Sequence, residues 1–226
     1  MANEDEKQVA ARASLQFVQD GQVLGLGTGS TAEYFIRLLA ERVRTGLKIR
    51  GIPTSVRSRQ LAEQLQIPLV TLEDCPEINI AIDGADEIDP QLRLIKGGGG
   101  ALLREKIVAS AAQRFIIVGD SSKQVSQLGK FPLPVEIVPF AECVVAPKIV
   151  ALGATVALRK YAYGNPFRTD EGHYILDCQF GKIADPDALA QKLSNMPGVV
   201  EHGLFIGMAE RALIGKKGQL VELKRP

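Results

Sequence analysis

Residues 96–106 read KGGGGALLREK, which combines residue types that can move a proton beside a carbonyl group. A run of four glycines costs folding free energy, so we expect it where the backbone must lie close to a ligand. Glu105 is predicted in the first turn of the following helix, near Lys96 and the glycine N–H groups. Its carboxylate could accept a proton from carbon while the ammonium and the N–H groups stabilise an oxyanion. For this segment taken alone, a solvated Arg-Glu-Lys helix face is the stronger alternative.

The segment GLGTGSTAE, residues 25–33, follows an apolar strand and opens a helix. It lacks the third glycine and the distant acidic residue of a dinucleotide fingerprint, and it lacks the lysine of a Walker A loop. What remains is a glycine turn at a helix N-terminus with the hydroxyls of Thr28, Ser30 and Thr31, which suits an anion the size of phosphate. Ser30 and Glu33 also fit a capping box, so we weigh the cap and the phosphate site equally.

Two more polar segments follow apolar strands. In DGADEID, residues 83–89, Asp83 and Asp86 could bind Mg²⁺, hold the hydroxyls of a sugar, or shape a turn. Turn shaping is favoured in isolation, although a turn needs only one of these acidic residues. In GDSSK, residues 119–123, Lys123 alone is typical of an exposed loop lysine.

These four segments lie within a regular alternation of strands and helices. Apolar runs on both faces, separated by amphipathic helices, predict an α/β fold with a Rossmann-like parallel sheet and helices on both faces. The carboxyl ends of parallel strands share one edge, where ligands bind, so the joint pattern favours a single composite site. The strands are expected at residues 22–27, 47–53, 68–72, 78–82, 92–95 and 114–119, and the helices at 5–18, 30–44, 55–66 and from 101.

The pattern changes at GKFPLPVEIVPF, residues 129–140, where three prolines occur. The order that follows is βαββαβ, which predicts a smaller ferredoxin-like α+β domain with residues 199–205 as its last strand. We therefore expect a Rossmann-like catalytic domain of residues 1–131 and 207–226. Residues 132–206 would form the α+β domain, a candidate oligomer interface.

Composition narrows the class of protein. A chain of 226 residues with 46% hydrophobic residues is predicted to be globular. Its net charge of +1 provides no basic field that would recommend nucleic acid or an acidic membrane as a partner. The polar start and the lack of long apolar runs predict a cytoplasmic protein without a membrane span. Only 5% of the residues are aromatic, and no aromatic surface on which a base could stack is evident. A phosphorylated sugar is therefore a better candidate ligand for the composite site than a nucleotide.

The cysteines and histidines offer little chemistry. Cys75, Cys143 and Cys178 form no CxxC or Cys/His pair, which argues against a disulfide framework or a zinc site, and we predict three small buried side chains. His173 and His202 are predicted to be hydrogen-bonded structural imidazoles. Acid–base chemistry then falls on carboxylates or lysines.

Four motifs together resemble the type A ribose-5-phosphate isomerase family. They are GTGST at 27–31, DGADE at 83–87, KGGGGALLREK at 96–106 and DSSK at 120–123. PGVVEHGLF near residue 200 also resembles the family's second-domain ending. The resemblance covers nearly the whole chain, and no key position departs from the family's pattern.

This resemblance implies interconversion of ribose 5-phosphate and ribulose 5-phosphate, without metal or organic cofactor, in the non-oxidative pentose phosphate pathway. It also implies a homo-oligomer, either a dimer or a tetramer. Glu105 matches the base that moves a proton between C2 and C1 through an enediolate, while Lys96 and the glycine backbone would stabilise the oxyanion. Asp83 and Asp86 would hold hydroxyls and assist ring opening. The implied substrate contacts are Lys7, Thr28, Gly29, Ser30, Thr31, Asp83, Gly84, Ala85, Asp86, Lys96, Gly97, Gly98, Gly99 and Lys123.

Two rival functions remain open from the residues. One is a non-catalytic sugar-phosphate sensor on the same fold. The other is a Mg²⁺-dependent phosphatase or sugar-phosphate enzyme with Asp83 and Asp86 as metal ligands.

Overall fold

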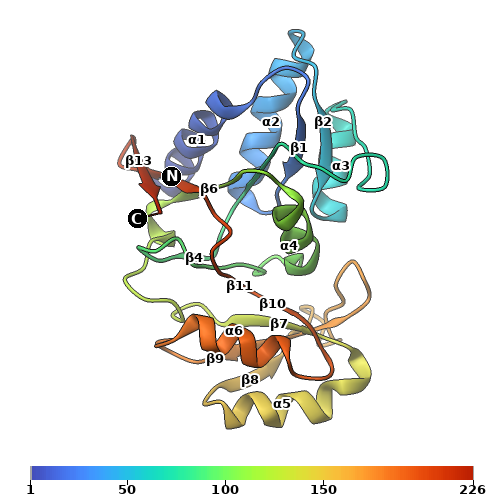
Figure 1. Ribbon diagram of the computed structural model, residues 1–226, viewed down its shortest axis with the longest axis vertical. Helices are drawn as coiled ribbons and strands as arrows, with labels where there is room; N and C mark the ends of the chain where they lie inside the picture. The colour runs from blue at the N-terminus through green and yellow to red at the C-terminus, as the bar shows by residue number, and fades with distance from the viewer. Residues whose placement is uncertain (1, 226) are drawn as a thin grey trace.

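A six-stranded sheet forms the centre of the computed structural model, which describes residues 2–225 (Figure 1). The strand order is β13-β12-β6-β3-β1-β2, and every neighbouring pair is parallel except the antiparallel edge pair β12 and β13. The predicted Rossmann-like parallel sheet is confirmed. Its strands are β1 (Val23–Leu26), β2 (Arg50–Pro53), β3 (Ile80–Asp83), β6 (Phe115–Asp120), β12 (Arg211–Lys216) and β13 (Gln219–Lys224).

Helices cover both faces of this sheet, as predicted. One core places Phe35, Ile36 and Leu39 of α2 against Leu24 and Leu26 of β1, together with side chains from α1 and α3. The other face carries α4, whose side chains pack against β3, β6 and β12. The bounds of these helices are α1 (Ala2–Ser14), followed by a short 3₁₀ turn (Leu15–Phe17), α2 (Ser30–Arg44), α3 (Val56–Gln64) and α4 (Leu102–Ala111).

Gly25 explains how closely α4 approaches the sheet. Leu24 and Leu26 point to the α2 face because side chains alternate along a strand, so Gly25 faces α4. A Cβ atom at Gly25 would lie 2.6 Å from Cγ1 of Val108. This close contact positions the first turn of α4, and with it Glu105, over the end of β1 and β3.

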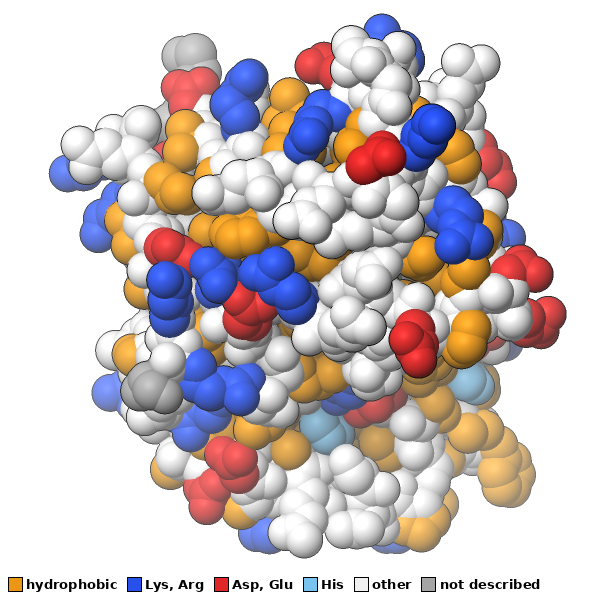
Figure 2. Space-filling model, turned by 45° about the horizontal axis from the view of Figure 1, so that its top comes forward, with side chains coloured by type: hydrophobic (Ala, Val, Ile, Leu, Met, Phe, Trp, Pro, Cys, Tyr) orange, Lys and Arg blue, Asp and Glu red, His pale blue; other side chains and the backbone are white. Residues whose placement is uncertain are grey.

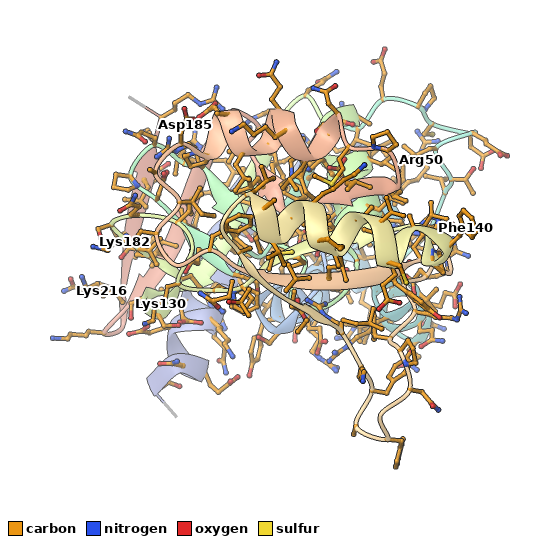
Figure 3. The ribbon with its side chains drawn as sticks, turned by 90° about the horizontal axis from the view of Figure 1, so that it is seen from below. Arg50, Lys130, Phe140, Lys182, Asp185 and Lys216 are labelled. Atoms are coloured by element: carbon orange, nitrogen blue, oxygen red, sulfur yellow. The ribbon has the colours of Figure 1, made fainter. Side chains whose placement is uncertain are left out.

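The second sheet has the ferredoxin-like arrangement that the βαββαβ order predicts. Its antiparallel strand order is β10-β7-β9-β8, and α5 and α6 cover one face of it, as the view from below in Figure 3 shows. The domain boundaries at 131/132 and 206/207 stay a prediction. The elements are β7 (Leu133–Ile137), a 3₁₀ turn (Pro139–Ala141), α5 (Glu142–Ala151), β8 (Thr155–Leu158), β9 (Tyr174–Gln179), α6 (Pro186–Ser194) and β10 (Val199–His202).

A third, small sheet joins the two units and was not predicted. It consists of β4 (Glu87–Ile88), β5 (Leu94–Ile95) and β11 (Leu204–Phe205) in the order β11-β5-β4. The expected single strand 199–205 is therefore wrong. It breaks at Gly203, which accepts a hydrogen bond from the Lys96 N–H and donates one to the Pro134 carbonyl. Only glycine fits there, because a Cβ atom would lie 2.3 Å from the Lys96 carbonyl oxygen.

The expected strand at residues 68–72 is also wrong. Leu69 forms only an isolated bridge with Gly51. Pro68 has no N–H to donate to a strand ladder, and from Thr71 the chain turns, because the Asp74 carboxylate accepts hydrogen bonds from the Thr71 backbone and hydroxyl.

The surface shows no strong charge asymmetry on the face drawn in Figure 2, where basic and acidic side chains are interspersed. Among residues 2–225, no helix is long and apolar enough to cross a bilayer.

Candidate active site

A pocket lies at the carboxyl ends of β1, β3 and β6, where the four polar segments come together. Its empty volume is about 470 Å³ including the open mouth. Of the predicted site residues, only Asp83 and Lys7 are absent from its wall. The lining residues are Thr28, Gly29, Ser30, Thr31, Gly84, Ala85, Asp86, Lys96, Gly97, Gly98, Gly99, Glu105 and Lys123.

Asp83, Lys96 and Glu105 form a buried ionic cluster at the pocket floor. Lys96 Nζ lies 3.0 Å from Asp83 Oδ2 and 3.5 Å from Glu105 Oε2, and it donates a hydrogen bond to the Gly84 carbonyl. The other Asp83 oxygen, Oδ1, accepts hydrogen bonds from the Thr28 and Gly84 N–H groups at 2.9 and 2.7 Å. Each of the three charged side chains is at most 5% exposed.

Burial shifts the pKa values in this cluster. Desolvation raises the pKa of Glu105 to about 8, because the opposing attraction of the Lys96 ammonium does not fully compensate. Burial lowers the pKa of Lys96, but the negative charges of Asp83 and Glu105 outweigh it and the net shift is upward. Two carboxylates share one ammonium, and only Asp83 has backbone N–H donors, so Glu105 is the group that takes a proton more readily. The lysine stays charged.

The glycine run forms a tight turn, in which the Gly100 N–H donates to the Gly97 carbonyl. Gly97 and Gly100 have φ values of +99° and +82°, which favour glycine. At Gly98 a Cβ atom would lie 2.6 Å from Asp86 Oδ1, whose partner oxygen accepts a hydrogen bond from the Gly98 N–H at 2.7 Å. At Gly99 a Cβ atom would touch only the Thr28 methyl group at 3.6 Å, on the pocket side. Three glycines therefore shape the turn, and the fourth leaves the pocket open.

The phosphate-sized turn is present at residues 27–31, but the capping box is wrong. The residue that precedes α2 is Gly29, with φ +102°, and no side chain among residues 2–225 caps the helix. Glu33 pairs with Arg57 at 2.5 Å instead of folding back on its own helix. Ser30 is exposed at the pocket, so the first-turn N–H groups and this hydroxyl face the space that a ligand would fill.

Sequence reasoning missed a cluster of hydroxyls behind this turn. The Thr28 hydroxyl lies 2.8 Å from those of Thr54 and Ser55 and 3.0 Å from that of Ser58. These contacts hold the turn at residues 27–31 in place. Ser58 also donates to the Gly27 carbonyl at 2.8 Å. A signal was available, because Thr54 and Ser55 follow β2 at the same sheet edge as the other polar segments.

Lys7 and Lys123 differ in their placement. Lys123 closes a 3₁₀ turn (Ser121–Lys123) and lines the pocket. Lys7 instead pairs with Glu4 at 2.9 Å, and its substrate contact stays a prediction. Its buried neighbour Glu6, which sequence reasoning missed, accepts hydrogen bonds from the Ser121 N–H and hydroxyl at 3.0 and 2.7 Å. Helix α1 thereby supports the turn that presents Lys123.

The comparisons with known proteins identify the family. The family model described as ribose 5-phosphate isomerase A (phosphoriboisomerase A) matches residues 50–219. A ribose-5-phosphate isomerase A of Parvibaculum lavamentivorans is 54% identical over 221 residues, which cover 95% of this chain and 96% of that one. The chain belongs to the ribose-5-phosphate isomerase A family. It is therefore an enzyme of the isomerase class.

Solved members of the family share this fold throughout. The ribose 5-phosphate isomerase A of Methanocaldococcus jannaschii has a TM-score of 0.94 at 44% identity, covering 98% of this chain and 99% of that one. A D-ribose-5-phosphate isomerase solved in complex with phospho-erythronic acid has a TM-score of 0.97 at 39% identity, with 100% of both chains covered. A second curated relative, from Synechococcus sp., is 55% identical over 218 residues, 95% of each chain.

The histidines lie outside the isomerase pocket. His173 Nδ1 lies 2.9 Å from Glu136 Oε1, and His202 Nε2 lies 3.1 Å from the Ser194 hydroxyl. Burial lowers the pKa of His202 to about 4, so it is neutral near pH 7. The prediction of hydrogen-bonded structural imidazoles is confirmed.

The cysteines differ from expectation. Cys178 is buried, Cys75 is half-buried, and Cys143 is exposed on α5. The prediction of three buried thiols is therefore confirmed for Cys178, holds only in part for Cys75 and is wrong for Cys143, because α5 buries Val145 and Ile149 against its sheet and leaves Cys143 outside.

Proposed function

We propose that this isomerase interconverts D-ribose 5-phosphate and D-ribulose 5-phosphate through an enediolate, with Glu105 as the base. The observation that carries the proposal is the buried pair of Glu105 Oε2 and Lys96 Nζ, 3.5 Å apart, beneath a turn of four glycines. A base next to a fixed positive charge and backbone N–H groups is what proton transfer α to a carbonyl needs.

In the proposed reaction the open-chain aldose lies with its aldehyde end above Glu105. The Glu105 carboxylate takes the proton from C2, the C2–H electron pair forms the C1–C2 double bond, and the former carbonyl oxygen on C1 becomes negatively charged. Lys96 and the glycine N–H groups stabilise that oxygen. The hydroxyl on C2 then passes its proton to the negatively charged oxygen on C1, which becomes the C1 hydroxyl as the C2 carbonyl forms, and Glu105 returns its own proton to C1. The raised pKa of Glu105 makes it a stronger base than an ordinary carboxylate.

The remaining pocket residues hold the rest of the substrate. Asp86 accepts hydrogen bonds from sugar hydroxyls and assists ring opening, and it is oriented by the Gly98 N–H. Asp83 lies beneath the pocket wall, so its part in holding a hydroxyl and assisting ring opening requires the substrate to displace Lys96 or one of the two backbone N–H groups that it now binds. The turn at residues 28–31 and Lys123 take the phosphate, since the first turn of α2 offers N–H groups and no side chain caps it. The proposal uses no metal and no organic cofactor.

Three further proposals concern the setting of the enzyme. We place it in the non-oxidative pentose phosphate pathway, in the cytoplasm, as a homodimer or a larger homo-oligomer. Sedimentation of the purified protein tests the oligomeric state, and cell fractionation tests the location.

The direct test is conversion of ribose 5-phosphate to ribulose 5-phosphate, and back, by the purified protein in excess EDTA. Turnover in both directions supports the proposal. Turnover that requires added Mg²⁺ would make the Asp83–Asp86 loop a metal site. Binding of ribose 5-phosphate without turnover would favour a sugar-phosphate sensor.

A further inference from the structure

The loop between β8 and β9, residues 159–173, extends from the second sheet to the glycine turn at residues 97–100, and we call it the β8–β9 arm. In Figure 1 it rises at the right of the molecule toward α4. Three of its contacts reach elements of the six-stranded unit. The Asp170 carboxylate accepts a hydrogen bond from the Val56 N–H at the start of α3, at 2.8 Å. Glu171 pairs with Arg104 of α4, and the Phe167 ring lies where a Cβ atom of Gly100 would be.

Arg159, at the base of the arm, makes the contact nearest the pocket. Its Nη1 donates hydrogen bonds to the carbonyls of Gly97 and Gly98 at 2.9 and 3.2 Å. The same guanidinium pairs with both carboxylate oxygens of Asp177 on β9, at 3.0 and 2.5 Å. Only 15% of the Arg159 side chain is exposed. A rigid, charge-compensated donor from the second sheet is therefore bound to the back of the glycine turn.

The peptide groups that Arg159 contacts have N–H groups on their other side. Peptide groups are planar and trans, so fixing the Gly98 carbonyl fixes the Gly99 N–H in the opposite direction. The Gly98 N–H, in the peptide group of the Gly97 carbonyl, donates to Asp86 at 2.7 Å. Within residues 2–225 no hydrogen bond uses the Gly99 N–H, and Gly99 lines the pocket. A donor on the carbonyl also polarises the N–H of the same peptide group.

We propose that Arg159 is a positioning residue, which orients the Gly99 N–H as an oxyanion donor by binding the Gly97 and Gly98 carbonyls. Four consecutive glycines have no side chains that could hold this turn, so its order depends on outside contacts. Arg159 supplies that contact from the second sheet, at the base of the β8–β9 arm. The inference rests on the proposed enediolate reaction.

The test compares Arg159→Gln and Arg159→Lys with Arg168→Gln. Arg168 is a matched control, since it lies on the same arm but its side chain contacts the Gly172 carbonyl and Tyr174 of β9 rather than the glycine turn. Loss of an oxyanion donor lowers kcat by about 10² to 10³. In Arg159→Gln the Gly99 N–H is still present but poorly oriented, so kcat should fall by about tenfold to a hundredfold. We expect that loss of kcat for Arg159→Gln, with KM for ribose 5-phosphate within about threefold of wild type.

Arg159→Lys keeps the charge but not the planar fork that reaches two carbonyls and Asp177, so it should lose part of the same rate. Phospho-erythronic acid, which a solved relative binds, carries a charged carboxylate and should inhibit the Arg159 variants less strongly than wild type. Arg168→Gln should match wild type in kcat and in its inhibition by phospho-erythronic acid. A folded Arg159→Gln or Arg159→Lys with kcat within about twofold of wild type would overturn the proposal, as would a rise in KM alone.

A second readout does not depend on turnover. The ¹⁵N amide resonance of Gly99 should shift or broaden in the Arg159 variants and stay in place in Arg168→Gln. If wild-type protein fails to convert ribose 5-phosphate, the proposed function fails, and this resonance still decides whether Arg159 orders the turn. An unchanged Gly99 resonance in Arg159→Lys would count against the positioning role.

Discussion

Lys96 Nζ lies 3.5 Å from Glu105 Oε2, and only 2% and 5% of the two side chains are exposed. The same ammonium lies 3.0 Å from Asp83, so one buried positive charge faces two carboxylates. With all three ionised the cluster has a net negative charge, and a proton on Glu105 removes it. This relationship makes Glu105 a stronger base than an ordinary carboxylate and also a group whose ionisation opposes folding.

Replacing Glu105 by Gln should remove the base without changing the size of the side chain. We expect kcat to fall by about 10² to 10⁴ while KM changes by less than about threefold, because the amide cannot accept the C2 proton. Steady-state kinetics with ribose 5-phosphate measures both constants. Glu41→Gln, at an exposed position on α2, is the control and should behave as wild type. Unchanged turnover in Glu105→Gln would rule out Glu105 as the base.

The pH dependence of kcat/KM should report the raised pKa of Glu105. A base must be deprotonated to act, so kcat/KM should rise with pH and level off near about 8. Below that value it should fall by about tenfold per pH unit. The phosphate of the substrate titrates near about pH 6, so the profile of kcat/KM against pH would show a second bend near that lower pH. A profile that is flat between about pH 7 and about pH 9 would contradict the pKa assigned to this carboxylate.

Replacing Ser30 by Ala should weaken binding of the phosphate and leave stability unchanged. A hydrogen bond to a charged group contributes about 1.5 to 3 kcal/mol, so KM should rise by about tenfold to a hundredfold with kcat little altered. No capping bond is lost, because Ser30 caps nothing, and the thermal midpoint should match wild type. Thr45→Ala, at the other end of α2, is the control. A lower midpoint with an unchanged KM would instead restore the capping role of Ser30.

Local patterns predicted most of the fold and the pocket wall. The strands of the parallel sheet are apolar on both faces, which follows from burial under helices, and polar loops at their carboxyl ends then meet at one edge. That is why Thr28, Asp86 and Lys123, which follow β1, β3 and β6 and are far apart in sequence, could be assigned to one site. Lys96 follows β5 of the small antiparallel sheet, so the expectation that its strand belongs to the parallel sheet is wrong. Each motif taken alone is weak evidence for a functional site. The shared edge of the sheet is what brings the motifs together in one site.

The failures arise where a contact between distant residues overrides a local preference. Ser30 and Glu33 have capping-box spacing, but Gly29 takes φ +102° and Glu33 is held by Arg57. The strand expected through Gly203 breaks because Lys96 and Pro134 bind its backbone. Arg159 lies 62 residues from Gly97, and no periodicity or spacing connects an arm of the second sheet with a turn of the first. Such contacts depend on how the two units pack together, which sequence patterns do not specify.

The stability of the folded protein should also depend on the ionisation of Glu105. Its pKa is about 8 in the folded state and 4.5 as an ordinary carboxyl, so the folded state binds about one more proton than the unfolded state between these values. The stability that this proton confers is fully present below 4.5 and is lost as pH rises through about 8, by about 1.4 kcal/mol per pH unit. Glu105→Gln has no such proton. Wild type should therefore lose stability relative to Glu105→Gln from about pH 5 to about pH 8, as measured by urea unfolding at each pH. A difference in unfolding free energy that stays constant across this window would mean that Glu105 is already ionised in the folded protein.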